Sequence, residues 1–175
     1  MSKFILFLSF IIFSQTGHAI NITLKGTKNS YLTNKHVFSG FGCKGENKSP
    51  EIKISDIPKN AKSLAITVYD PDAPTGGGWW HWLVFNIPVK TTHIKEGAKN
   101  LNKLGATQSL NSFGTKIFGG ACPPIGDTPH RYIFTVYALK VEKIDLSNST
   151  TPNTVGYYLN ANTVAKATSV ALYGR

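Results

Sequence analysis

Two stretches of the chain concentrate side chains that could bind or transfer charge. The first, residues 68–88, has the sequence VYDPDAPTGGGWWHWLVFNIP and carries Asp70, Asp72 and His81. Its prolines fix the backbone and exclude a helix, so both carboxylates are held in one geometry. A hairpin-like return of the chain would bring His81 near Asp70, which would fix the histidine tautomer and favour its protonated form. Such a pair could hold a phosphate or carboxylate group.

The second stretch, residues 118–132, has the sequence FGGACPPIGDTPHRY and is expected to form the opposite wall of an anion-binding pocket. Its glycines let the backbone approach a ligand closely, and exposed amides there can bind anions. His130 enters a strand just after this loop. For Arg131 we expect a salt bridge to an aspartate of the DPDAP turn. Taken alone, Asp70 and Asp72 fit equally well a plain turn in which aspartate caps backbone amides.

Catalysis is the competing interpretation of the same side chains. Histidine and aspartate could serve as acid and base, but no serine lies in a nucleophile motif and no HxxxH-type spacing indicates a metal site. The two cysteines, Cys43 and Cys122, suggest a disulfide if the chain is exported. A catalytic thiol at Cys122 is the alternative, although the sequence Ala-Cys-Pro-Pro is more typical of a fixed loop. We therefore expect a non-enzymatic protein without metal or cofactor.

The elements that must position these residues are mainly β-strands. Alternating, β-branched and aromatic residues predict strands over residues 20–24, 51–55, 64–69, 81–87, 132–140 and 169–173. Residues 36–41 fit a strand or an extended loop. Residues 91–113 are expected to form a long loop with one turn of helix, and residues 155–167 to form the main helix. Together they predict a mainly β protein, an antiparallel β-sandwich with a few short helices and a C-terminal helix.

The first residues predict export. Residues 1–3 supply a short positive segment through Lys3, and residues 4–13 form an almost unbroken apolar run. Residues 17–19 place small side chains where a signal peptidase reads them. We expect a signal peptide over residues 1–19, cleavage after Ala19, and a single periplasmic or secreted domain over residues 20–175. A transmembrane anchor is the alternative, but the apolar run is too short to cross a bilayer, so an integral membrane protein is not expected.

Composition narrows the class of partner. The 175-residue chain has a formal charge of +10, and 41% of its residues are hydrophobic against 16% charged, which argues against disorder. All basic residues except Arg131 and Arg175 are lysines, and they are spread along the chain. No basic stripe for nucleic acid is present, so a solvated lysine-rich surface is the favoured interpretation and a general attraction for anions the alternative.

The motifs, in their order, resemble the phosphatidylethanolamine-binding protein family, also called Raf kinase inhibitor-like proteins, and especially its exported bacterial members. The matching segments are GCKGENKSPEI, DPDAP followed by HW, NSFG, FGGACPP and PHRYIFTVYAL. The resemblance implies an antiparallel β-sandwich with one small pocket for a phosphoryl or carboxylate group, such as a phosphoethanolamine-like headgroup. Carried over by motif, the pocket residues are Asp70, Asp72, His81, His130 and Tyr132, with backbone around Ala121 and Cys122.

The resemblance also implies that Cys43 and Cys122 face each other near the pocket mouth and that the Ala73–Pro74 bond is cis. Two positions depart from the family pattern, because Ser112 stands where many members have Asp and Phe118 where Tyr is common. The expected partner is a small anionic ligand or a phospholipid headgroup. A protein-interaction modulator, similar to a kinase or protease inhibitor, is the alternative function, and both an unidentified protein partner and a homodimer are compatible with the sequence.

Overall fold

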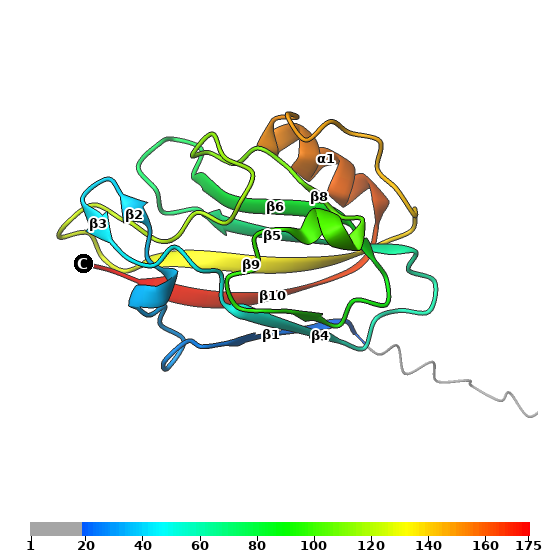
Figure 1. Cartoon of the computed structure of the whole chain (residues 1–175), viewed down its shortest axis with the longest axis horizontal. Coiled ribbons are helices and arrows are strands. Elements are labelled where there is room, and N and C mark those ends of the chain that lie inside the picture. Colours follow the sequence, from blue (N-terminus) through cyan, green and yellow to red (C-terminus); the bar gives the residue numbers. More distant parts are fainter. Residues whose placement is uncertain (1–18) are drawn as a thin grey trace, which may run out of the picture.

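Two antiparallel sheets form the body of the molecule (Figure 1). The computed structural model describes residues 19–175, so the predicted signal peptide lies outside the described residues apart from Ala19. The larger sheet has the strand order β10-β9-β5-β6-β8, and the smaller one β1-β4-β7. The larger sheet comprises β5 (Ser63–Asp70), β6 (Trp79–Pro88), β8 (Thr107–Gln108), β9 (His130–Leu139) and β10 (Thr163–Tyr173). The smaller comprises β1 (Asn21–Lys25), β4 (Glu51–Ser55) and β7 (His93–Ile94).

Two hydrophobic clusters cover the two faces of the larger sheet. One contains side chains from both sheets, including Ile52 of β4, Val68 of β5 and Val136 of β9, and forms the interior of the sandwich. The other lies beneath helix α1 (Pro152–Asn162), where Leu159 packs with residues such as Phe85. Burial on both faces explains why β5 is almost continuously buried along its length. The predicted mainly β sandwich with a C-terminal helix is confirmed.

The C-terminal helix differs from its prediction in position. It spans Pro152–Asn162 rather than residues 155–167, and β10 begins directly at Thr163. The helix starts early because the Thr151 side chain accepts a hydrogen bond from the Thr154 amide and a proline occupies the first turn. It ends early because residues 163–173 alternate in burial and pair with β9 along their length, an arrangement available only to extended backbone.

The two less regular segments contain short elements. Residues 36–41 are not one strand: a 3₁₀-helix (Asn34–His36) is followed by β2 (Ser39–Gly40), which pairs with β3 (Cys43–Lys44). The long loop predicted over residues 91–113 contains β7, a 3₁₀-helix (Leu101–Leu104) and β8. The β2–β3 hairpin and the C-terminus lie at the same end of the molecule (Figure 1). Within residues 19–175, no helix is both long and apolar enough to cross a bilayer.

Candidate functional site

At one end of the larger sheet, the residues that face the sandwich interior change from apolar to polar. On β5, Asp70 follows Val68 by two residues and therefore continues its face. On β9, His130 and Tyr132 share one face in the same way, and both are buried. The two strands are paired as far as Tyr69 and Ile133, so Asp70 and Tyr132 come side by side just beyond the last pair.

A β-bulge places His81 at the same end of the sheet. Val68 is opposite Trp82, whereas Tyr69 is opposite Trp80, so His81 is an extra residue on β6 without a partner on β5. Bulges redirect a side chain out of the regular alternation. The His81 ring consequently lies edge-on to that of Tyr132, with the ring centres 5.1 Å apart.

These residues line a cavity of about 180 Å³. Its polar lining consists of Asp70, His81, His130 and Tyr132, together with Thr75. The other lining residues are apolar or sulfur-containing and come from both predicted walls and two further loops: Phe41, Ala73, Pro74, Trp79, Phe113, Cys122, Pro123 and Pro124. The structure thus brings the two stretches singled out in the sequence together around one space, with Phe41 and Phe113 as additions.

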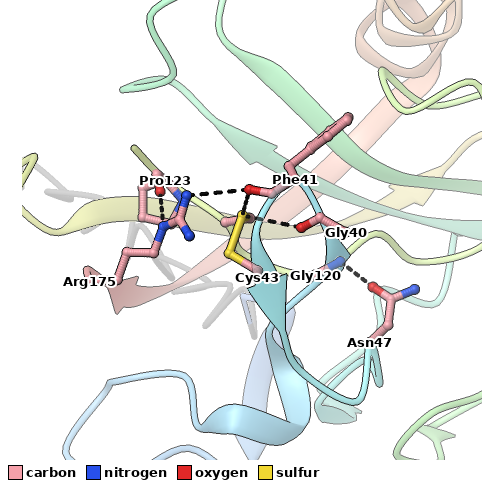
Figure 2. The surroundings of a disulfide bond; sticks show 8 residues. Gly40, Phe41, Cys43, Asn47, Gly120, Pro123 and Arg175 are labelled. Carbon is pink, nitrogen blue, oxygen red and sulfur yellow. Dashed lines mark hydrogen bonds between the residues drawn. A yellow bond between two sulfur atoms is a disulfide. The ribbon is translucent and has the colours of Figure 1, made fainter. Parts of the chain in front are cut away.

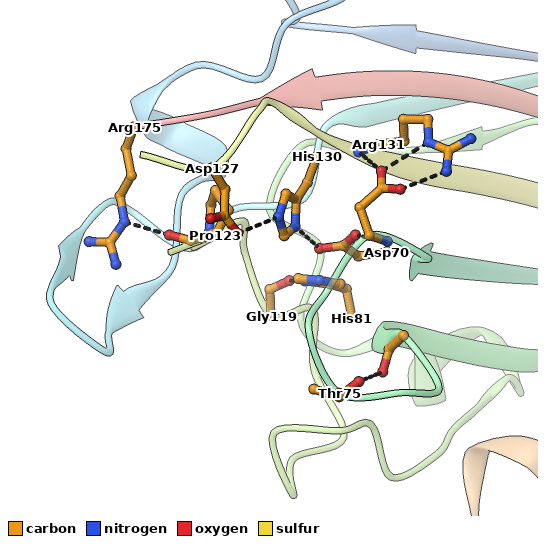
Figure 3. A network of polar contacts seen from close by, with 11 residues as sticks. Asp70, Thr75, His81, Gly119, Pro123, Asp127, His130, Arg131 and Arg175 are labelled. Carbon is orange, nitrogen blue, oxygen red and sulfur yellow. Dashed lines mark hydrogen bonds and ion pairs between the residues drawn. The ribbon is translucent and has the colours of Figure 1, made fainter. Parts of the chain in front are cut away.

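Asp70 pairs with His130, so the predicted pairing of Asp70 with His81 is wrong. The Asp70 carboxylate lies 2.8 Å from His130 Nδ1, and the Asp127 carboxylate lies 3.3 Å from His130 Nε2 (Figure 3). Burial alone would lower the pKa of His130, but the hydrogen bond and charge of Asp70, helped by Asp127, raise it. Both ring nitrogens face carboxylate oxygens, which only accept hydrogen bonds, so His130 is a cation held between two carboxylates. The prediction failed because the Asp70 carboxylate is already engaged by His130 Nδ1 and the Asp72 amide, while His81 Nδ1 is held by the Gly119 carbonyl.

His81 is oriented by the backbone instead. Its Nδ1 donates to the Gly119 carbonyl oxygen at 2.7 Å, so Nε2 is the atom left for another partner (Figure 3). That Nε2 is buried and has no hydrogen-bond partner among the described residues, and the same holds for the Tyr132 hydroxyl. Burial lowers the pKa of His81 to about 4 and, with the nearby Asp70 charge, raises the pKa of Tyr132. Both groups are therefore neutral near pH 7.

Two of the predicted site residues do not line the cavity. The Asp72 carboxylate is held by Arg131, whose Nε and Nη2 lie 2.9 and 2.6 Å from its oxygens. These hydrogen bonds lower the pKa of Asp72 to about 2, and they confirm the expected Arg131 salt bridge. The Ala121 backbone is engaged with the segment after the first 3₁₀-helix: its N–H donates to His36 and its carbonyl accepts from Phe38. Of the two predicted backbone positions, only Cys122 faces the cavity.

The predicted disulfide is confirmed. Cys43 and Cys122 are joined with their Cα atoms 6.0 Å apart, so the alternative of a free thiol at Cys122 is wrong. The bond ties the β2–β3 hairpin to the loop that lines the cavity (Figure 2). Arg175 supports the same region, because its Nε donates to the Pro123 carbonyl at 2.6 Å and its Nη2 approaches the Phe41 carbonyl at 3.5 Å. No motif in the sequence pointed to this role of Arg175.

Two buried or partly buried asparagines hold the loop that orients His81, and neither was predicted. Asn111 donates to the His81 and Ile117 carbonyls, while its own carbonyl oxygen accepts from the Phe113 amide. Asn47 accepts from the Gly120 amide at 2.6 Å and so fixes the backbone next to Gly119. Both residues lie within the segments GCKGENKSPEI and NSFG, which were the only signal that could have identified them.

The two departures from the family pattern have local explanations. The Ser112 hydroxyl accepts a hydrogen bond from the Trp80 amide at 2.9 Å, a bond that a carboxylate could also accept, so serine keeps the contact without adding a negative charge. Phe118 is buried and lies edge-on to Trp82. The cis Ala73–Pro74 bond implied by the resemblance is wrong, since no cis peptide occurs among residues 19–175 and trans is the preferred isomer before proline.

Comparisons with known proteins agree with this architecture. A family model described as phosphatidylethanolamine-binding protein matches residues 27–174. The chain is 50% identical over 171 residues to the protein YbcL of Escherichia coli, and this alignment covers 95% of this chain and 93% of YbcL. It is 42% identical over 145 residues to E. coli YbhB, with 81% of this chain and 91% of YbhB covered. The crystal structure of E. coli YbcL, described as a new member of the mammalian PEBP family, superposes with a TM-score of 0.85 over 89% of this chain and 98% of YbcL. The crystal structure of a Chlamydia trachomatis homologue, 31% identical in sequence, superposes with a TM-score of 0.76 over 90% of this chain and 99% of the homologue.

Proposed function

Because the chain belongs to the phosphatidylethanolamine-binding protein family, we propose that it is a non-enzymatic extracytoplasmic protein that binds a small ligand by its phosphate or carboxylate group, with a phosphoethanolamine-like headgroup as the model ligand. One observation carries the proposal: two buried polar atoms without hydrogen-bond partners, His81 Nε2 and the Tyr132 hydroxyl, belong to residues that line the same cavity.

An oxyanion bound together with one proton would satisfy both atoms, because Nε2 of neutral His81 can only accept and the Tyr132 hydroxyl can donate. A buried polar group that lacks a hydrogen bond costs about 1–3 kcal/mol, and this cost disappears when a ligand supplies the partner. The Tyr132 hydroxyl can donate directly to a ligand oxygen, since burial keeps it protonated. The apolar lining from residues such as Trp79 and Phe113 shields these bonds from water, as is usual in small-molecule pockets.

The arrangement favours binding over catalysis. His130 has both ring nitrogens engaged by carboxylates, so it is held as a fixed charge rather than positioned to move a proton. The thiols of Cys43 and Cys122 are joined to each other and supply no nucleophile. Within residues 19–175, no group of three or more His, Cys, Asp or Glu side chains is placed to hold a metal ion.

The disulfide supports the extracytoplasmic part of the proposal. Disulfides persist in oxidising compartments and are rare in the reducing cytoplasm. The bond between Cys43 and Cys122 lies beside the cavity, because Cys122 is one of the lining residues. This agrees with the signal peptide expected from residues 1–19.

Calorimetry with Tyr132→Phe tests the binding site. Phosphate, phosphoethanolamine and acetate are titrated into the folded chain and into the variant, which removes one hydroxyl without changing ring packing. We expect wild type to bind at least one of these anions and Tyr132→Phe to bind it about 10- to 100-fold more weakly, corresponding to the loss of one hydrogen bond to a charged group. Tyr157→Phe on the exposed face of α1 is the matched control, because Tyr157 is 70% exposed.

Two results would contradict the proposal. The first is the absence of any heat of binding for all three anions with folded wild type. The second is equal affinity of wild type, Tyr132→Phe and Tyr157→Phe, which would place the bound anion elsewhere, for example on surface lysines.

A further inference from the structure

We infer that each oxyanion that enters the cavity is accompanied by one proton, which is shared between the ligand and Nε2 of His81. The inference rests on the proposed function, because it concerns the ionisation state in which the same site accepts its ligand. The inference names two equivalent bound states. In one, the ligand's acid group carries the proton; in the other, the ligand is an anion beside protonated His81.

The hydrogen bonding of His81 carries the first step. The Gly119 carbonyl oxygen lies 2.7 Å from Nδ1, and a carbonyl can only accept, so Nδ1 must carry a hydrogen. In the neutral ring Nε2 then has a lone pair and no hydrogen. A fully deprotonated phosphate or carboxylate also presents only lone pairs. A hydrogen bond between the two therefore requires one additional proton.

The charges that face His81 carry the second step. Asp70 approaches from β5, and His130 and Tyr132 approach from β9, while the loop on the remaining side contributes the Phe113 ring and the backbone around Gly119. The positive charge of His130 is already matched by Asp70 at 2.8 Å and by a second carboxylate, that of Asp127, at 3.3 Å. Those three groups together carry a net charge of −1.

No other cation is available at the lining. Among the described residues that line the cavity there is no lysine and no arginine. Of the two arginines nearby, Arg131 is paired with the Asp72 carboxylate, and Arg175 donates to the backbone carbonyl of Pro123 without itself lining the cavity. A buried anion without a compensating charge is strongly disfavoured. The proton supplies that charge.

The protonation state of the free site completes the argument. Burial lowers the pKa of His81 to about 4, so the ring is neutral near pH 7 and a bound anion at Nε2 would raise its pKa. A phosphate monoester has its second pKa near 6, so it too is deprotonated at pH 7.5. Binding at that pH should therefore take up about one proton, and the dissociation constant should rise about tenfold for each pH unit above 7.

Calorimetry in buffers of different ionisation enthalpy measures this proton directly. We expect phosphoethanolamine at pH 7.5 to bind with uptake of about one proton, and its dissociation constant to rise about tenfold from pH 7 to pH 8. Sulfate, which does not titrate in this range, is the second probe. If sulfate binds with proton uptake, the proton lies on His81. If phosphoethanolamine binds and sulfate does not, the proton lies on the ligand. Either result supports the inference.

A variant of His81 separates this site from other titrating groups. His81→Asn can keep a donor for the Gly119 carbonyl and lacks Nε2, so it should bind phosphoethanolamine more weakly and without the proton uptake of wild type. His93→Gln is the control, because His93 is an exposed histidine paired with Glu51 and should leave proton uptake unchanged.

Wild-type binding without net proton uptake and with a dissociation constant that is flat from pH 6 to pH 8 would overturn the inference. Undiminished proton uptake in folded His81→Asn would also overturn it. If His81→Asn does not fold, proton uptake by wild type and the pH dependence of its dissociation constant still test the inference. Absence of any binding by folded wild type would instead contradict the proposed function, so the two failures are distinguishable.

Discussion

Asp70→Ala is expected to lower the free energy of unfolding by about 3–5 kcal/mol, because it leaves a buried histidine cation without its main counter-charge. The Asp70 carboxylate accepts from His130 Nδ1 at 2.8 Å and from the Asp72 amide at 2.8 Å, and both members of the ion pair are almost completely buried. Urea unfolding at pH 7 with the disulfide intact gives the difference from wild type. The pKa of His130, followed by NMR, should fall in the variant if it remains folded.

Asp72→Ala in the same turn is the matched control. Asp72 also forms an ion pair, but its side chain is 29% exposed and that of its partner Arg131 is 56% exposed. Exposed pairs typically contribute no more than about 1 kcal/mol, so Asp72→Ala should be much less destabilising than Asp70→Ala. Equal costs for the two substitutions would show that the Asp70–His130 pair has no special importance for the fold.

Replacing both cysteines by alanine is expected to lower the free energy of unfolding by about 4 kcal/mol. Cys43 and Cys122 are 79 residues apart in the sequence, and closing a loop of this length restricts the unfolded chain strongly in the chain-entropy model. Thermal and urea unfolding of wild type and of the double variant measure the effect. Phosphate or phosphoethanolamine binding should weaken as well, because the bond ties the hairpin that carries Phe41 to the cavity wall.

A reducing agent provides the control for the disulfide. It should lower the stability of wild type towards that of the Cys43→Ala/Cys122→Ala variant and leave the variant itself unchanged. A difference of less than about 1 kcal/mol between oxidised wild type and the variant would contradict a major stabilising role. So would a wild-type protein whose stability does not respond to reduction.

The strands that form the larger sheet could be predicted because their burial follows local sequence. Residues 64–69 and 132–140 are rich in β-branched and aromatic side chains, and both became central strands with ends shifted by one or two residues. The boundary between α1 and β10 could not be predicted in the same way. Residues 163–167 are small or β-branched apart from Lys166 and fit either period. Pairing with β9, a contact distant in sequence, decides for the strand.

The residues that line the site were easier to predict than the hydrogen bonds and ion pairs between them. Motif and residue type placed Asp70, His81, His130 and Tyr132 together, and these four do line one cavity. Which histidine pairs with Asp70 depends on contacts distant in sequence: His130 on the neighbouring strand takes the carboxylate, and the Gly119 carbonyl, 38 residues from His81, takes His81 Nδ1.

Supporting contacts were beyond the reach of local sequence patterns. The role of Asn111 requires the His81 carbonyl, 30 residues away, to lie beside it. The role of Arg175 requires the loop at Pro123, 52 residues away. The Asp72–Arg131 ion pair, in contrast, could be anticipated, because two exposed opposite charges at the ends of neighbouring strands need no irregular backbone to meet.

A crystal structure of the chain soaked with phosphoethanolamine tests the central claim most directly. We expect the phosphate group inside the cavity, with one oxygen about 2.7–3.2 Å from His81 Nε2 and another about 2.5–3.0 Å from the Tyr132 hydroxyl. A Tyr132→Phe crystal treated identically should show weaker ligand density at this place. Wild-type density for the phosphate only on surface lysines, with water alone between His81 and Tyr132, would contradict the account.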